Sequence, residues 1–195
     1  MLLKKVVFLD RDGVINREAA SYVTSWSDFE FLPGSIDAIK RLTQNGFTII
    51  LITNQSIINR KMIPLKTLET IHANMKKAVE SRGGKITDIL FCPHTPDDDC
   101  RCRKPKPGMI LKAGEKYNID LSSAVMVGDR SKDIACARNA GCATTVMVKT
   151  GSCCYSEKRL MQQGLLPDHV AENLYEAATW IIFHDKTCIP SPDNP

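Results

Sequence analysis

Residues 5–13 read KVVFLDRDG, a short apolar run that passes directly into two aspartates and a glycine. Apolar runs that do not alternate with polar residues are typical of strands buried on both faces of a sheet. Four further runs of this kind follow along the chain, at residues 47–52, 86–91, 124–127 and 144–148. We therefore predict five buried strands, of which the first begins at Lys5 and ends at Leu9.

Segments with helical periodicity separate these strands. We predict a helix from Ser35 to Asn45, with the Ser35 side chain as its N-cap and Gly46 in a positive-φ conformation after its end. Further helices are predicted from Pro64 onward, over residues 131–140 and over residues 172–183. Strands that alternate with helices indicate an α/β fold with a doubly wound parallel sheet.

The length and composition are those of a single folded domain. The chain has 195 residues, of which 43% are hydrophobic and 25% are charged, and its formal net charge is +4. We expect one domain over residues 1–188 without a separate cap domain, and a disordered tail at 189–195, where prolines are frequent.

The same composition excludes several classes of partner. The chain has no Lys- or Arg-rich run that could follow a phosphate backbone, so we expect no nucleic-acid partner. No apolar stretch approaches the roughly 18 residues of a membrane span, and the first residues lack the apolar core of a signal peptide. We expect a cytoplasmic monomer that has no contact with a membrane.

Oxygen-bearing side chains follow three of the predicted strands. Asp10 and Asp12 follow the first strand, Thr53 and Asn54 follow the second, and Asp129 follows the fourth. Ligands bind at the carboxyl ends of the strands in this type of sheet. Carboxylates gathered there would repel one another unless a cation neutralises them. We therefore predict a site for Mg²⁺ together with a substrate phosphate, which an all-oxygen ligand set suits.

Four soft metal ligands lie close together in the sequence, at Cys92, His94, Cys100 and Cys102. A closed set of four thiolate and imidazole ligands suits a structural, tetrahedral Zn²⁺. The loop that carries these ligands contains three aspartates and two prolines and little that could form a core, so a metal would stabilise it. We expect the zinc to fix the loop and thereby to place the two cations that follow it, Arg103 and Lys104.

Four segments together resemble the motifs of the haloacid dehalogenase superfamily of phosphatases. They are FLDRDGVIN at 8–16, ITNQS at 52–56, CRKP at 102–105 and VGDR at 127–130. Within that superfamily, three more segments are similar to those of the D-glycero-D-manno-heptose 1,7-bisphosphate phosphatases, namely FEFLPG at 29–34, KPGM at 106–109 and VKTG at 148–151. The resemblance covers nearly the whole chain, and the four predicted zinc ligands match the zinc loop of this family.

The resemblance implies a reaction and its main residues. The reaction would remove the C7 phosphate of the heptose bisphosphate through an aspartyl phosphate, on the route to nucleotide-activated heptose. Asp10 would be the nucleophile, and Asp12 would be the general acid and base. The side chains of Asp10 and Asp129 and the backbone carbonyl of Asp12 would hold Mg²⁺.

The resemblance also implies residues that bind the substrate, namely Thr53 and Lys104 for the transferred phosphate and Asn54 and Arg103 for the sugar or its other phosphate. Arg130 and Asp133 would support the site. Asp133 would assist either the magnesium shell or Lys104, unless it only opens its helix. The substrate in all of these readings is a small phosphorylated sugar.

The chain departs from the heptose phosphatases after Ser56, where they continue GIARG and this chain has IINRK at 57–61. If those two glycines hold positive φ, the loop must take another path here. Two other functions remain open. Histidinol-phosphate phosphatase, from the same superfamily, shares the zinc loop and a Gly-Asp-Arg at strand four. A non-catalytic, zinc-stabilised binding module on the same fold is the alternative from another class.

The remaining reactive and aromatic side chains have no recognisable pattern. We expect Cys136, Cys142, Cys153, Cys154 and Cys188 to be buried or surface thiols. His72 falls near the apolar face of its predicted helix, and we expect it to be packed rather than catalytic. Tyr22 and Trp26 either contact the substrate or pack on the surface.

Overall fold

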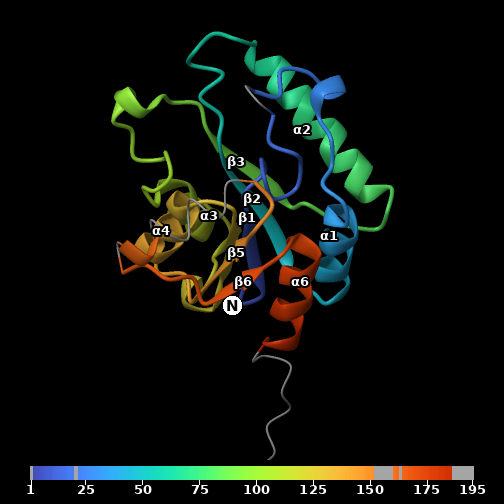
Figure 1. Cartoon of the computed structure of the whole chain (residues 1–195), viewed down its shortest axis with the longest axis vertical. Coiled ribbons are helices and arrows are strands. Elements are labelled where there is room, and N and C mark those ends of the chain that lie inside the picture. The colour runs from blue at the N-terminus through green and yellow to red at the C-terminus, as the bar shows by residue number, and fades with distance from the viewer. Residues whose placement is uncertain (1, 20–21, 152–159, 163, 186–195) are drawn as a thin grey trace, which may run out of the picture.

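A parallel sheet of six strands forms the centre of the protein (Figure 1). The computed structural model describes residues 2–19, 22–151, 160–162 and 164–185. Its strands are β1 (Val6–Leu9), β2 (Thr48–Asn54), β3 (Asp88–Cys92), β4 (Val125–Gly128), β5 (Thr144–Val148) and β6 (His169–Ala171). Their spatial order is β3-β2-β1-β4-β5-β6, and every neighbouring pair is parallel. The order of the strands reverses between β1 and β4, which is where open α/β sheets bind ligands.

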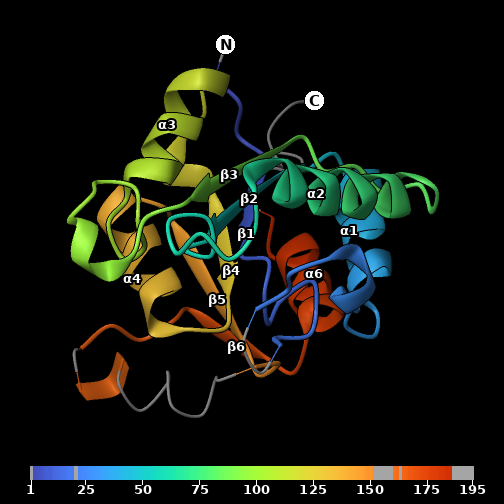
Figure 2. The same cartoon turned by 90° about the horizontal axis from the view of Figure 1, so that it is seen from above.

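Helices cover both faces of the sheet (Figure 1 and Figure 2). On one face lie α1 (Ser35–Gln44), α2 (Leu65–Glu80) and α6 (Leu174–Phe183). On the other face lie α3 (Gly108–Tyr117) and α4 (Ser131–Ala140). Short 3-10 turns occupy Trp26–Asp28, Pro96–Asp98 and Leu121–Ser123.

Alternate residues of β1 enter the two hydrophobic cores. Val7 and Leu9 pack in the core beneath α1, α2 and α6, whereas Val6 and Phe8 pack in the core beneath α3 and α4. All four side chains are fully buried. Successive side chains of a strand point to opposite faces, so a strand covered on both sides is apolar at every position. This requirement explains the continuous apolar run at the start of the sequence.

The predicted α/β architecture and the five predicted strands are confirmed, and each strand begins and ends within two residues of its predicted bounds. The helix predicted over residues 131–140 has those bounds in the structure. The last helix begins at Leu174 instead of residue 172, because the Asn173 side chain caps it by accepting a hydrogen bond from the backbone N–H of Glu176 at 3.0 Å.

The prediction that Ser35 caps α1 is wrong. Ser35 is the first residue of the helix, and its buried hydroxyl has no hydrogen-bond partner among the described residues. The chain enters the helix through Gly34, whose φ of 76° is a left-handed conformation that glycine adopts readily. The predicted exit through Gly46 is confirmed, since its φ is 80°.

Two elements escaped the sequence prediction. β6 has three residues and pairs only with β5 at the edge of the sheet, so it is too short to produce a recognisable apolar run. α3 contains Gly108 and Gly114, and glycine has a low helix propensity.

Some predictions fall outside the described residues, namely those for the tail at 189–195 and for Cys153, Cys154 and Cys188. Cys136 and Cys142 are buried free thiols, and burial raises the pKa of each to about 12. In the part of the chain that is described, no helix has the length and hydropathy needed to cross a membrane.

In the loop after β2, the two positions at which this chain lacks a glycine, Ile57 and Lys61, have different environments. Ile57 is fully buried in the core that contains α1 and α2. Lys61 is exposed and has a φ of 55°, a conformation that is uncommon for a residue with a side chain. Asn59 ties the loop to the cysteine-bearing loop, because its Nδ2 donates to Asp98 Oδ2 at 3.1 Å.

Replacing Lys61 by glycine is expected to raise the free energy of unfolding by about 0.5–1 kcal/mol, because relief of the left-handed strain outweighs the added backbone entropy. Urea-induced unfolding would measure the change. The matched control is Ala73→Gly at an exposed position inside α2, which should lower the same free energy by about 1 kcal/mol. A Lys61→Gly variant that is less stable than the parent would contradict the assignment of strain at this position.

Candidate active site

The predicted oxygen ligands meet at the carboxyl ends of β1, β2 and β4. Asp10 directly follows β1, and its backbone N–H donates to the carbonyl of Val127 at 3.0 Å, which extends the pairing of β1 with β4. Asp129 directly follows β4, and Thr53 lies at the end of β2. Because β1 stands between β2 and β4 in the sheet, these three side chains converge at one rim.

Asp10, Asp129 and Asp133 form a buried acidic cluster. One carboxylate oxygen of each lies within 4.8 Å of the others, and no residue of the three is more than 5% exposed. The ammonium group of Lys104 lies among them, with its Nζ 2.8 Å from Asp10 Oδ2 and 2.7 Å from Asp133 Oδ1. It also donates to the carbonyl of Ile52 at 2.8 Å. Burial disfavours the charged form, but the two carboxylates outweigh it and raise the pKa of Lys104, which stays cationic.

Asp129 is the member of the cluster that lacks a hydrogen-bond partner among the described residues. Neither of its oxygens accepts a hydrogen bond from a described residue, and Arg130 Nε stands 3.6 Å from Oδ2. Burial, assisted by the charges of Asp133 and Asp10, raises the pKa of Asp129 to about 8. When ionised, the three carboxylates face one ammonium, so two negative charges remain. A divalent cation would balance them, and the all-oxygen donor set fits Mg²⁺.

Two glycines make room for the Asp129 carboxylate. Gly13 and Gly151 have φ values of 82° and 105°, conformations that L side chains rarely adopt. A Cβ atom at either position would lie 2.5 Å from Asp129 Oδ2. Thr150 joins the two loops, because its hydroxyl donates to the carbonyl of Gly13 at 2.7 Å. The loops after β1 and β5 therefore pack their backbones directly against the carboxylate.

Asp12 lies outside the acidic cluster and has its own set of donors. Arg11 donates from Nη2 to both carboxylate oxygens, at 2.8 and 2.9 Å, and from Nε to Oδ1 at 3.2 Å. Asn16 Nδ2 and Gln55 Nε2 donate to the same carboxylate at 2.9 and 2.8 Å. Burial disfavours the anion, but the Arg11 charge and these hydrogen bonds bring the pKa of Asp12 below its usual value.

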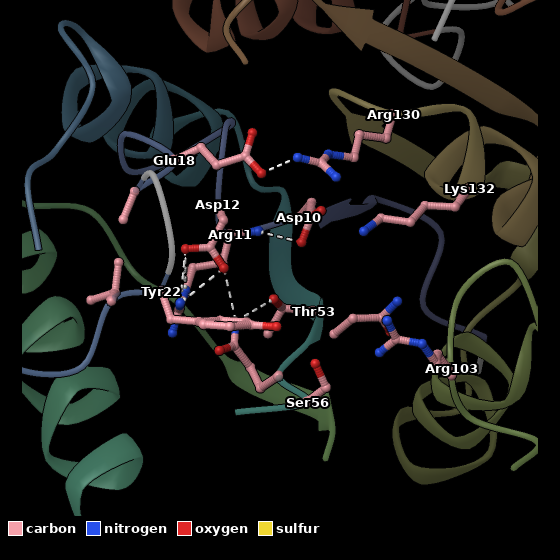
Figure 3. Close-up of a pocket in the computed structure, with 14 residues that line it drawn as sticks. Asp10, Arg11, Asp12, Glu18, Tyr22, Thr53, Ser56, Arg103, Arg130 and Lys132 are labelled. Atoms are coloured by element: carbon pink, nitrogen blue, oxygen red, sulfur yellow. Dashed lines mark hydrogen bonds and ion pairs between the residues drawn. The ribbon is translucent and has the colours of Figure 1, made fainter. Parts of the chain in front are cut away.

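A cavity of about 240 Å³ opens over Asp10 (Figure 3). From one side it is lined by Arg103, Arg130 and Lys132, and from the other by Asp12, Glu18 and Tyr22. Arg130 forms an ion pair with Glu18 across the cavity. Three cations on one wall favour an anionic ligand, and their spread suits a ligand with more than one negative group.

Three of the four predicted substrate-binding residues, Thr53, Asn54 and Arg103, line this cavity, whereas Lys104 is buried behind it in contact with Asp10. Thr53 is buried at its floor and accepts a hydrogen bond from Gln55 at 2.9 Å. Asn54 uses its side-chain amide to hold the backbone of Lys104, donating to its carbonyl at 3.2 Å and accepting from its N–H at 3.1 Å. A direct contact between Asn54 and substrate stays a prediction.

Asp133 serves two of the roles considered for it. One oxygen pairs with Lys104, and the other accepts from the backbone N–H of Arg130 at 3.0 Å, which closes the first turn of α4. The side chain therefore supports the buried ammonium and opens its helix at the same time.

The four predicted zinc ligands lie together at the end of β3 and in the loop between β3 and α3. The Sγ atoms of Cys92, Cys100 and Cys102 and the Nδ1 atom of His94 lie 3.2 to 3.6 Å from one another in the five pairs that are in contact. A tetrahedral zinc with bonds of about 2.3 Å requires ligand separations of about 3.7 Å, close to those observed. Arg103, the next residue, donates to the carbonyl of His94 at 2.9 Å, which links the cluster to the cavity.

Sequence reasoning missed several residues of the site. Arg11, Asn16 and Gln55 hold Asp12, and Glu18 and Lys132 line the cavity. Arg11 could have been found, because a cation between two aspartates at a strand end is a signal in itself. Asn16 and Gln55 lie inside the segments FLDRDGVIN and ITNQS, but nothing in those segments shows that their amides bind Asp12. Glu18 and Lys132 have no sequence signal, since the cavity brings distant segments together. Of the two aromatic candidates, Tyr22 lines the cavity, whereas Trp26 stacks on Phe29 with ring centroids 5.0 Å apart.

Comparison with known proteins gives consistent matches. A family model described as HAD-hydrolase-like matches residues 101–177. The D-glycero-beta-D-manno-heptose-1,7-bisphosphate 7-phosphatase of Bordetella bronchiseptica is 41% identical over 180 residues, which cover 91% of this chain and 98% of that protein. The D-glycero-alpha-D-manno-heptose-1,7-bisphosphate 7-phosphatase of Photorhabdus laumondii is 42% identical over 154 residues, which cover 75% of this chain and 84% of that protein.

The fold comparison agrees with these matches. The crystal structure of D,D-heptose 1,7-bisphosphate phosphatase from B. bronchiseptica, complexed with magnesium and phosphate, has a TM-score of 0.85 at 40% identity and covers 92% of this chain and 98% of its own. The identities and the coverage show the family as well as the fold. The chain therefore belongs to the heptose 1,7-bisphosphate phosphatase family of the haloacid dehalogenase superfamily.

Proposed function

We propose that this protein is a Mg²⁺-dependent phosphatase that removes the C7 phosphate of D-glycero-D-manno-heptose 1,7-bisphosphate. The product, heptose 1-phosphate, would enter the synthesis of nucleotide-activated heptose. The observation that carries this proposal is the acidic cluster with its buried ammonium, because one member of it, Asp10, lines a cavity that has three cations on one wall. The names of the relatives supply the substrate.

Asp10 is the nucleophile in this proposal. Its Oδ1 accepts from the backbone N–H of Arg11 at 2.7 Å, and its Oδ2 lies 2.8 Å from Lys104 Nζ. Each carboxylate oxygen has two lone pairs, so one remains for attack. An oxygen of Asp10 attacks phosphorus while the bond between phosphorus and the C7 oxygen breaks, which forms an aspartyl phosphate. Thr53 lines the cavity beside Asp10 and Lys104 contacts Asp10, so both are suited to binding the phosphoryl oxygens.

Asp12 carries the protons. It gives a proton to the departing C7 oxygen and then takes one from the water that attacks the aspartyl phosphate, which releases phosphate and restores Asp10. Its lowered pKa makes the resting carboxylate ionised. The negative charge of an arriving phosphate favours the protonated form that the first step needs.

Mg²⁺ would be held by the side chains of Asp10 and Asp129 and by the backbone carbonyl of Asp12. When bound, it neutralises charge on the phosphoryl group that is transferred. Arg103 and Lys132 stand farther along the cavity wall, and they are suited to the phosphate that is not hydrolysed (Figure 3).

Several broader features belong to the same proposal. We infer that Cys92, His94, Cys100 and Cys102 bind a structural Zn²⁺. Three thiol ligands need a reducing compartment, which supports action in the cytoplasm. All six described strands belong to one sheet, which supports a single domain without a cap. We also infer that the protein acts as a monomer, which size-exclusion chromatography would test.

Phosphate release assays test the function. With Mg²⁺, the protein should release one phosphate from the heptose bisphosphate, and both the alpha and the beta anomer should be compared, because relatives are named for each. Asp10→Asn should lower turnover by about 10⁴-fold or more, because it removes the nucleophile. Asp37→Asn on the exposed side of α1 is the matched control. Faster release from histidinol phosphate would favour that enzyme instead, and no release from any ester would favour a binding module.

Asp129→Asn should abolish the stabilisation that Mg²⁺ gives. In the parent protein, Mg²⁺ should raise the unfolding temperature, because the ion binds the folded state and balances the buried carboxylates. The variant should show no such rise, and its metal-free unfolding temperature should not fall, because the substitution removes a buried acid that accepts no hydrogen bond from the described residues. Differential scanning fluorimetry over a range of Mg²⁺ concentrations measures both effects. If Mg²⁺ stabilises the variant as much as the parent, Asp129 is not a ligand of the metal.

Cys100→Ser should reduce the zinc content and the unfolding temperature, and activity should fall as a consequence because Arg103 and Lys104 lose their support. Metal analysis, thermal unfolding and turnover would be measured on the same sample. Cys142→Ala, at a buried thiol outside the cluster, should keep its zinc. A zinc-free Cys100→Ser variant with full activity would refute the proposed link between the metal and the two cations.

A further inference from the structure

The buried histidine of α2 contacts the catalytic loop from behind. His72 is 7% exposed, and its Nε2 lies 3.2 Å from Nη1 of Arg11, which is only 1% exposed. We propose that His72 is a positioning residue that acts through Arg11 to hold the Asp12 carboxylate in place for proton transfer, a role that rests on the function proposed above.

The chemistry of the contact defines the state of the ring. A guanidinium group can only donate hydrogen bonds, so His72 Nε2 must be the acceptor and the ring proton must lie on Nδ1. A protonated imidazolium could not accept this bond. Burial and the adjacent Arg11 charge lower the pKa of His72 to about 3, which agrees with a neutral ring at physiological pH.

Arg11 is bound at both ends of its guanidinium group. Its Nε and Nη2 donate to Asp12, and its Nη1 is directed to His72 (Figure 3 shows the Asp12 end). A buried guanidinium N–H without an acceptor is costly, so loss of the histidine acceptor would favour rotation of the group toward another one. Because the guanidinium is planar and rigid, such a rotation would also displace the donors that orient Asp12.

Packing alone does not account for this arrangement. His72 contacts Phe91 with ring centroids 6.0 Å apart, and an apolar side chain could make that contact equally well. Only an acceptor can satisfy Arg11 Nη1. Asn16 and Gln55 bind Asp12 independently of His72, so removal of the histidine should weaken the positioning of Asp12 without abolishing it.

The expected kinetic signature is a fall in kcat without a change in KM. Asp12 acts on protons, whereas the cations that suit the substrate phosphates lie on the opposite wall of the cavity (Figure 3). His72→Leu should lower kcat by about 10- to 100-fold, the cost of misplacing a reacting group by about 1 Å. His72→Gln places an amide oxygen near the position of Nε2, so its kcat should stay within about threefold of the parent.

The two variants are compared with Met75→Leu, which changes a buried residue one turn along α2 that has no polar partner. Heptose bisphosphate turnover gives kcat and KM, and thermal unfolding shows whether each variant is folded. Equal losses in His72→Leu and His72→Gln would indicate packing and overturn the proposal. An unchanged kcat in His72→Leu, or a rise in KM alone, would overturn it as well.

A double-mutant comparison tests whether the effect passes through Arg11. In an Arg11→Lys background the bridge from His72 to Asp12 is absent, so His72→Leu should cause no further loss of kcat. Additive losses would contradict the proposal. The side-chain NMR signal of Arg11 Nε provides a readout that needs no activity. Its N–H should exchange slowly with solvent in the parent and in His72→Gln but rapidly in His72→Leu.

The NMR readout separates this inference from the proposed function. If the parent protein hydrolyses no phosphate ester, the proposed function is contradicted. If the Arg11 N–H exchanges at the same rate in the parent and in all variants, the proposed role of His72 is contradicted. If His72→Leu does not fold, the His72→Gln variant still decides the question. A His72→Gln variant with a kcat reduced by about tenfold or more would then contradict the acceptor role.

Discussion

The charge balance of the site depends on a single ammonium group. Lys104 Nζ is buried and binds Asp10, Asp133 and the carbonyl of Ile52. Without this group, three carboxylates would face one another in the interior, where unpaired charges of one sign are costly. Its position follows from two supports, because Asn54 holds the Lys104 backbone and the cysteine and histidine cluster ends at Cys102. The charge balance of the site therefore depends on the conformation of that loop.

The two walls of the cavity carry different kinds of side chain. Asp12 and the donors that orient it stand on the wall formed by the loop after β1, which α2 supports from behind through His72. Arg103 and Lys132 stand on the opposite wall, which the cysteine-bearing loop and α4 provide. Acid–base groups and anion-binding groups thus come from separate segments.

Much of the fold and the main chemistry could be predicted, because the relevant signals are local. Asp10, Thr53 and Asp129 stand at the ends of apolar runs, and parallel strands bring such ends to one rim. The predicted zinc ligands lie so close together in the sequence that their spacing is recognisable as a metal-binding motif. The orientation of side chains could not be predicted. Asn54 lies at the end of β2 as expected, yet its amide binds the Lys104 backbone, a contact that no periodic pattern encodes. Ser35 shows the same limit, since a backbone turn through Gly34 replaced its expected cap.

The wide spacing of the charged groups along the chain has a consequence for biosynthesis. Asp10 emerges from the ribosome early, whereas the ammonium that compensates it is translated much later and Asp133 later still. A nascent chain that ends after β3 can pair its first strands but carries an uncompensated acid at their rim. The cysteine and histidine cluster emerges immediately before Lys104, so a metal bound there would fix this loop just before the ammonium group becomes available. Arrest of translation before this point would leave a half-built sheet with an open, acidic edge.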